Sequence, residues 1–149
     1  MRKTLGYMVT FTTYGTWLQG DERGWVKNGI IYEENMELRK ANEGQMKVVP
    51  VKLGRKEKEI VREAIRKKAK AIGEKIFAMS VWSNHVHIVA GYSGRPIEET
   101  VRIYKNTASA ALKESKFKGR IWTNGYDKRF CFDESSLAER IKYVNEHKK

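Results

Sequence analysis

A short stretch in the second half of the chain constrains the fold and the chemistry more than any other. Residues 83–90 read Ser-Asn-His-Val-His-Ile-Val-Ala, a pattern typical of a tight turn followed by a β-strand. Because successive strand side chains point to opposite faces, His85 and His87 are expected on one face and the intervening apolar residues in a core. Two adjacent imidazoles can bind a metal ion. The alternative is a pair of partly exposed histidines without a ligand.

The third histidine, His147, follows Tyr143 by four residues near the C-terminal end. Both are expected on one face of a final helix, and we predict that this helix packs against the histidine strand. Three neutral nitrogen ligands with open positions can hold a divalent ion that polarises a phosphodiester oxygen. A phenol beside such a cation can act as a covalent nucleophile. The predicted reaction is transesterification, which leaves a phosphotyrosine and allows rejoining without ATP. Tyr104, the other candidate nucleophile, lies on an apolar helix face, so packing in the core is expected.

The overall charge indicates a polyanionic partner. Thirty basic residues against eighteen acidic ones give a formal net charge of +12, which favours nucleic acid over a merely soluble basic protein. No apolar run is long enough for a membrane-spanning helix, and the first residues lack the pattern of a secretory signal. The single cysteine, Cys131, excludes an internal disulfide. We therefore expect a cytoplasmic protein without a membrane partner.

The hydrophobic pattern predicts one domain over residues 1–149. Strands are expected at 6–14, 30–32, 76–82 and 85–92, with one or two short strands within 121–132. Helices are expected at 55–71, at 96–115 and after residue 133, where Ser136 and Glu139 have the spacing of a capping box. The loop 15–25 contains Trp25, expected to pin the loop, and Trp17, for which base stacking stays open.

Several polar and basic side chains are candidates for DNA contact. Hydroxyl, amide and ammonium groups commonly bind phosphate, and basic residues among aromatic ones suit single strands. For Lys105, Asn106, Thr107 and Ser109, an ordinary polar helix face is an equal alternative to DNA contact. For Trp122, a role in the scaffold is equally plausible. The basic face of the 55–71 helix is interpreted as a solvated face, with phosphate contact as the alternative. The candidates are Lys105, Asn106, Thr107, Ser109, Arg120, Trp122, Lys128, Arg129 and Arg140.

Taken in order, these segments resemble the single-tyrosine transposases of the HUH endonuclease superfamily, especially the REP-associated and insertion-sequence enzymes. The resemblance rests on the opening strand 7–15, on Ser83–His87 after an apolar strand, and on the helix carrying Lys105 to Ser109. It continues through 122–134 into Ile141-Lys142-Tyr143-Val144-Asn145. Many REP-associated relatives have Asn-Pro after the tyrosine, whereas Asn145 is followed here by Glu146 and His147.

The resemblance implies an α+β fold, a ferredoxin-like antiparallel sheet with helices packed on it. It implies His85, His87 and His147 as ligands of Mg²⁺ or Mn²⁺, with Tyr143 as the nucleophile that forms a 5′-phosphotyrosine. The implied partner is single-stranded DNA near hairpins, with a homodimer as one assembly, in the nucleoid of a bacterial or archaeal cell.

Three other functions remain to be weighed. One is a basic nucleic-acid-binding domain, inactive or domesticated, which would bind DNA without forming an adduct. A histidine-triad hydrolase is set aside because Val89 occupies the third alternating position. Replication initiators and relaxases share the histidine pair, but within larger proteins.

Overall fold

The protein is an antiparallel sheet with helices on both faces, and the computed structural model describes residues 3–16 and 50–146. The predictions for Trp17, Trp25, the 30–32 strand and His147 lie outside these residues. The strands are β1 (Gly6–Thr12), β2 (Ile76–Val81), β3 (His85–Gly91) and β4 (Asp127–Cys131), in the order β2-β3-β1-β4. Every neighbouring pair is antiparallel. The predicted α+β class, an antiparallel sheet with packed helices, is confirmed.

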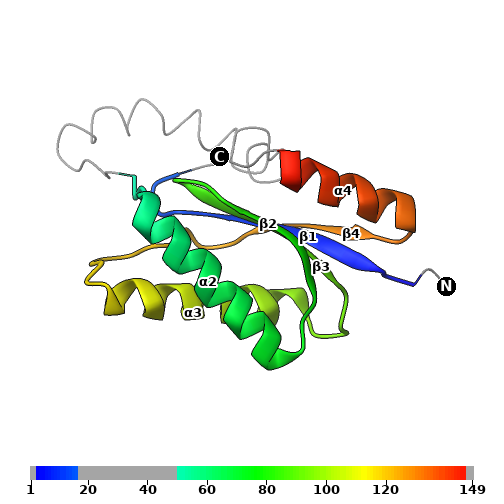
Figure 1. Ribbon diagram of the computed structural model, residues 1–149, viewed down its shortest axis with the longest axis horizontal. Coiled ribbons are helices and arrows are strands. Elements are labelled where there is room, and N and C mark those ends of the chain that lie inside the picture. The colour runs from blue at the N-terminus through cyan, green and yellow to red at the C-terminus, as the bar shows by residue number, and fades with distance from the viewer. Residues whose placement is uncertain (1–2, 17–49, 147–149) are drawn as a thin grey trace, which may run out of the picture.

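Two helices cover one face of the sheet, and a third covers the other (Figure 1). Helices α2 (Arg55–Ile72) and α3 (Ile97–Glu114) pack against each other and form the first layer, while α4 (Glu134–Glu146) lies opposite. Among the described residues, no helix is both long and apolar enough to cross a bilayer.

The main core lies between the sheet and the α2–α3 layer. Strand residues of one parity point into it, and their partners are the apolar stripes of the two helices, as helical spacing predicts. Tyr104 is fully buried in this core, so its expected packing role is confirmed. Burying each large apolar side chain contributes about 1.5–3 kcal/mol. The central members are Val9, Phe11, Val86, Ile88, Val61, Ile65, Val101 and Leu112.

The second face of the sheet carries a smaller apolar cluster under α4. Met8, Ala78, Val89 and Val144 are buried there, with Leu137 and Ile141 partly buried against them. Leu137, Ile141 and Val144 form the apolar stripe of this helix. Since the cluster is small, α4 leaves part of this sheet face open to polar side chains.

The residue that caps the start of α4 differs from the one expected. The helix begins at Glu134, and the side-chain oxygen Oδ1 of Asp133 accepts the Ser136 amide at 2.7 Å. Asp133 therefore occupies the N-cap position, and the expected Ser136–Glu139 capping box is wrong. An aspartate that accepts a hydrogen bond from the amide of the third helical residue is a favoured N-cap, and the helix accordingly starts at Glu134.

The first strand is shorter than predicted. It ends at Thr12, and Thr13 forms an isolated bridge with Trp122. The 121–132 segment accordingly supplies one full strand, β4, and this single bridge. Both changes occur where the chain leaves the sheet.

Candidate functional site

The paired histidines lie at the beginning of β3, on the face that α4 partly covers. Their ring centroids are 4.7 Å apart. The indole of Trp82 stacks on His85, with centroids 5.1 Å apart and planes 15° from parallel. On the opposite face of β3, Val86 and Ile88 are fully buried. The alternation predicted for this strand is therefore present, with two imidazoles above and an apolar core below.

In each imidazole, the ring nitrogen Nδ1 is hydrogen-bonded to a neighbouring side chain. His85 Nδ1 lies 2.7 Å from the amide oxygen of Asn84, which can only accept a hydrogen bond, so Nδ1 donates. His87 Nδ1 lies 2.8 Å from the hydroxyl of Thr10, its register partner on β1. Coordination of an ion through Nε2 of each ring would leave both Nδ1 contacts intact. Burial lowers the pKa of His85 and favours the neutral form that ligates metals.

Helix α4 brings Tyr143 to the histidine pair. Its ring centroid lies 5.9 Å from that of His87, with the planes at 76°. The next residue, Val144, is fully buried against the sheet, whereas Tyr143 is 41% exposed. The phenol therefore stands at the border between the packed helix face and solvent. The predicted meeting of the last helix with the histidine strand is observed.

The donor set at this site is incomplete within the described residues. Within residues 3–16 and 50–146, no group of three or more His, Cys, Asp or Glu side chains is positioned to hold a metal ion. His147, the expected third ligand, lies outside these ranges. The two imidazoles fit part of a divalent-ion site, and nitrogen donors suit Mn²⁺ better than Mg²⁺, which demands oxygen ligands.

Two of the candidate DNA contacts are engaged in the scaffold. The Lys105 ammonium donates to the carbonyls of Thr123 and Gly125 at 2.9 and 2.7 Å, and burial lowers its pKa. The indole of Trp122 is 7% exposed, packs edge-on against Phe11 and donates to the Lys105 carbonyl. These bonds join α3 to the segment before β4. A base could stack on Trp122 only if this packing were disrupted. We therefore do not assign Lys105 or Trp122 to DNA contact.

The remaining candidates lie on the surface or at its border, and their contact with DNA stays a prediction. The Arg120 guanidinium covers the Tyr14 ring at 4.4 Å, and Arg129 pairs with Asp127 at 3.4 Å. Asn106 and Lys128 are exposed, whereas Thr107, Ser109 and Arg140 are half-buried. They do not form one cluster with the histidines: the α3 residues lie on a helix that covers the opposite sheet face.

Three residues of the site were not singled out from the sequence. Asn84 and Trp82 are sequence neighbours of the histidines, so their proximity was a usable signal. Thr10 is 77 positions from His87, and only the strand register reveals it.

Known proteins similar to this chain were found by sequence family and by solved structure. The family model described as "Transposase IS200 like" matches residues 50–147, more than half of the chain, including both paired histidines and Tyr143. A REP-associated tyrosine transposase, solved bound to a REP hairpin, has a TM-score of 0.55 at 11% identity, covering 97% of this chain and 67% of that one. At this identity the likeness shows the fold. A candidate transposase from Deinococcus radiodurans R1 has a TM-score of 0.47 at 16% identity, covering 99% of this chain and 94% of that one.

No curated protein matches the chain significantly. The family model alone nevertheless spans the site as well as the greater part of the fold. The chain belongs to the IS200-like transposase family.

Proposed function

We propose that this transposase cuts and rejoins single-stranded DNA through a covalent bond to Tyr143. The observation that carries the proposal is the approach of the Tyr143 ring to His87, at 5.9 Å between centroids, beside a second imidazole at 4.7 Å. A nucleophile and candidate ligands for an activating ion thus come from one chain and meet on one sheet face. Their roles rest on this geometry and on the chemistry of the groups.

In the proposed reaction, the Tyr143 phenol oxygen attacks a phosphorus atom of the DNA backbone. The phenolic proton passes to solvent, the P–O3′ bond breaks, and the departing oxygen takes a proton to become a free 3′-hydroxyl. The protein is then joined to the 5′-phosphate. Rejoining reverses the step: a 3′-hydroxyl attacks the phosphotyrosine and releases the phenol. The number of ester bonds is conserved, so no ATP is consumed.

His85 and His87 would hold the divalent ion through Nε2, since Asn84 and Thr10 engage their other nitrogen. Mg²⁺ or Mn²⁺ bound there would polarise the phosphate and stabilise the phenolate. The two imidazoles would thus hold the ion on strand β3, while the proposed nucleophile lies on α4. His147 remains the proposed third ligand.

The proposed substrate is single-stranded DNA next to a hairpin. The net charge of +12 favours a polyanion, and the structurally similar REP-associated transposase was solved with a REP hairpin. The protein-bound stem would position the adjoining single strand near Tyr143.

A labelled hairpin with single-stranded flanks tests the proposal. Incubation with Mn²⁺ should give a covalent protein–DNA band resistant to denaturing gel electrophoresis. Tyr143→Phe should abolish this band, whereas Tyr104→Phe should retain it because Tyr104 lies in the core. Removal of the ion with EDTA should also abolish it.

An inactive nucleic-acid-binding domain is the competing function. It would bind the same hairpin with a steep salt dependence yet give no adduct with any divalent ion. Persistence of the band in Tyr143→Phe would overturn the assignment of the nucleophile.

A further inference from the structure

We propose that a basic pocket at the β2 edge, far from the histidine pair, binds an unpaired nucleotide of the DNA strand. The pocket has a volume of about 350 Å³ and lies between the end of α2 and β2. Its lining combines one exposed aromatic ring, Phe77, with three cations, Arg66, Lys70 and Lys75. The inference rests on the proposed function only in taking single-stranded DNA as the partner.

The aromatic ring of the pocket is accessible and already carries a cation. Phe77 is 37% exposed, and the Lys75 ammonium lies 5.7 Å from its centroid. The strand is irregular here, because the β2–β3 register shifts between Ile76 and Ala78. Phe77 lies within this irregularity, and its apolar ring is exposed. Bases stack on such rings regardless of sequence.

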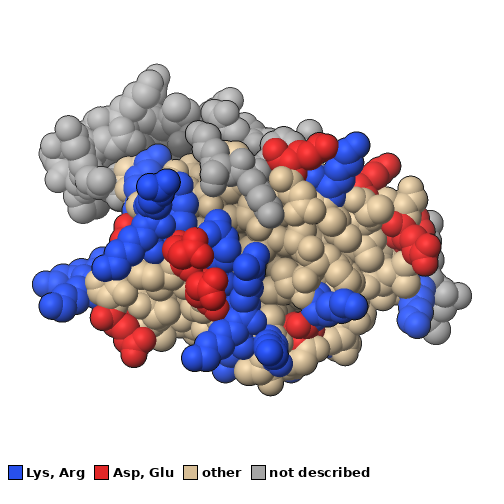
Figure 2. All heavy atoms as spheres, viewed as in Figure 1, with Lys and Arg blue, Asp and Glu red and all other residues tan. Residues whose placement is uncertain are grey.

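The second half of α2 concentrates positive charge beside this ring. Arg66, Lys67, Lys68 and Lys70 follow one another without an acidic residue, whereas Glu57, Glu59 and Glu63 all lie in the first half. Figure 2 shows the basic side chains gathered over α2. Like charges one helical turn apart disfavour the helix, and none of the ion pairs found among the described residues involves these four cations. A bound phosphate would relieve this repulsion.

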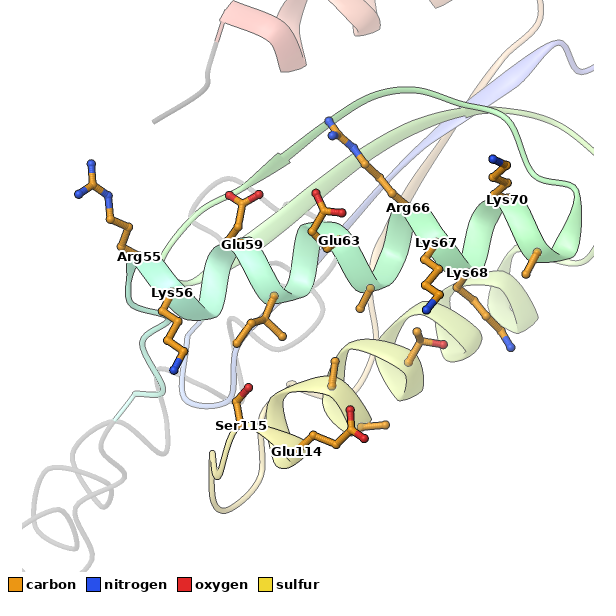
Figure 3. Close-up of a pocket in the computed structure, with 16 residues that line it drawn as sticks. Arg55, Lys56, Glu59, Glu63, Arg66, Lys67, Lys68, Lys70, Glu114 and Ser115 are labelled. Atoms are coloured by element: carbon orange, nitrogen blue, oxygen red, sulfur yellow. The ribbon is translucent and has the colours of Figure 1, made fainter.

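All four cations line the groove toward α3, and Arg66 and Lys70 also line the pocket beside β2. Arg66 and Lys70 extend from one side of α2, and Lys67 and Lys68 extend from the other, toward α3 (Figure 3). The α3 side is an open groove of about 1460 Å³ with an alanine-rich floor and acidic residues among its lining. The β2 side is the smaller pocket, where an aromatic ring and cations meet. The chemistry of a nucleotide, one flat base and one phosphate, matches the smaller pocket.

The single acid of the pocket does not cancel its charge. Glu74 is buried, and its Oε1 accepts hydrogen bonds from Arg95 at 3.1 Å and from Ser93 at 3.0 Å. Its carboxylate is therefore neutralised by Arg95 from outside the pocket. Arg66, Lys70 and Lys75 therefore give the pocket lining a net positive charge.

The pocket lies at the opposite end of β3 from the histidines. Ile76 pairs with Ala90, whereas Ser80 pairs with His87. From His85 to Gly91 the strand covers about 20 Å at 3.3 Å per residue. A DNA strand leaving the catalytic face would reach the pocket only after several nucleotides. The pocket would therefore read or hold the flank of the substrate, away from the bond that is cut.

Binding of two DNA molecules tests the inference without cleavage. One is a blunt hairpin, and the other is the same hairpin with a ten-nucleotide single-stranded overhang, measured by fluorescence anisotropy in EDTA with Tyr143→Phe protein. Adding Phe77→Ala should weaken overhang binding about tenfold, as loss of a stacking ring does in single-strand complexes, and leave the blunt hairpin unchanged. Adding Lys75→Ala should lower the slope of log Kd against log salt by about 0.7.

Phe130→Ala is the matched control. Phe130 is 38% exposed on the other edge strand and has a lysine 5.8 Å from its ring centroid, so the ring and its cation are alike while the pocket differs. It should change neither affinity. Unchanged overhang binding by Phe77→Ala, an equal loss for both hairpins, an equal loss in Phe130→Ala, or an altered oligomeric state would overturn the inference. Adduct formation by the unaltered protein reports separately on the proposed function.

Discussion

Thr10 holds one of the paired imidazoles through a hydrogen bond between adjacent strands. Its hydroxyl lies 2.8 Å from His87 Nδ1, and the residue is only 2% exposed. Such a contact fixes the ring orientation and the nitrogen that faces an ion, and its loss typically costs 10–100-fold in metal affinity. Asn84 has the same relation to His85. The geometry of the proposed site therefore depends on residues that bind no ligand themselves.

Replacing Thr10 by the isosteric valine should weaken the apparent affinity for Mn²⁺ about tenfold. The replacement keeps the packing and removes the bond to His87, which also costs about 1 kcal/mol of stability. The measurement is adduct formation against Mn²⁺ concentration. Thr12→Val is the control, because the Thr12 hydroxyl donates to the Thr16 carbonyl rather than to a histidine. Equal Mn²⁺ curves for both variants would contradict the positioning role of Thr10.

At the scale of elements, the approach of α4 to the sheet depends on Gly6 in β1. A Cβ atom on Gly6 would lie 2.7 Å from the Ala90 carbonyl oxygen and 2.8 Å from a Leu137 methyl carbon. Real Cβ atoms do not approach this closely, so a side chain would displace either the strand pairing or the first turns of α4. The position of Tyr143, about two turns further along α4, depends on this close packing of α4 against β1.

Gly6→Ala should destabilise the protein by about 1–3 kcal/mol, as overpacking does. It should also reduce adduct formation, because α4 must shift to relieve the contact with Leu137. Denaturant unfolding and the adduct assay measure the two effects. Gly91→Ala is the matched control: Gly91 is the register partner of Gly6, and its Cβ would only reach the Phe77 ring at 3.5 Å. A Gly6→Ala protein as stable as Gly91→Ala would show that α4 is not seated this tightly.

At the scale of the whole molecule, Tyr143, the proposed nucleophile, and the histidine pair come together within one chain. The Tyr143–His87 contact joins α4 to β3 without a second subunit. A homodimer remains a proposal, and the geometry favours one in which each chain completes its own site.

Mixing two inactive variants tests this arrangement. His87→Ala retains the tyrosine, and Tyr143→Phe retains both histidines, so a site shared between chains would recover activity in the mixture. We expect no adduct from the mixture at any ratio, because each chain lacks one part of its own site. The control is a mixture of either variant with unaltered protein, which should give adduct in proportion to the unaltered chain. Recovery in the mixture of variants would establish exchange of α4 between subunits.

Much of the fold was predictable from local patterns. The 55–71 and 96–115 helices agree with α2 and α3 within a residue or two, since amphipathic spacing repeats over several turns in both. The capping of α4 was not predictable in the same way, because Asp133 and Ser136 both satisfy the composition of an N-cap. The sequence singled out His85, His87 and Tyr143, whose rings the structure brings together, but not Thr10.

The sequence alone determined that two imidazoles share one strand face and that an amphipathic helix follows residue 133, because alternation and helical periodicity are properties of neighbouring residues. Only the tertiary structure decided that Thr10 contacts His87, that Lys105 and Trp122 are held in the scaffold, and that Phe77 lines one pocket with Arg66 and Lys70 of α2. These contacts join segments far apart in sequence. Their register and packing depend on the free energy of the whole folded chain.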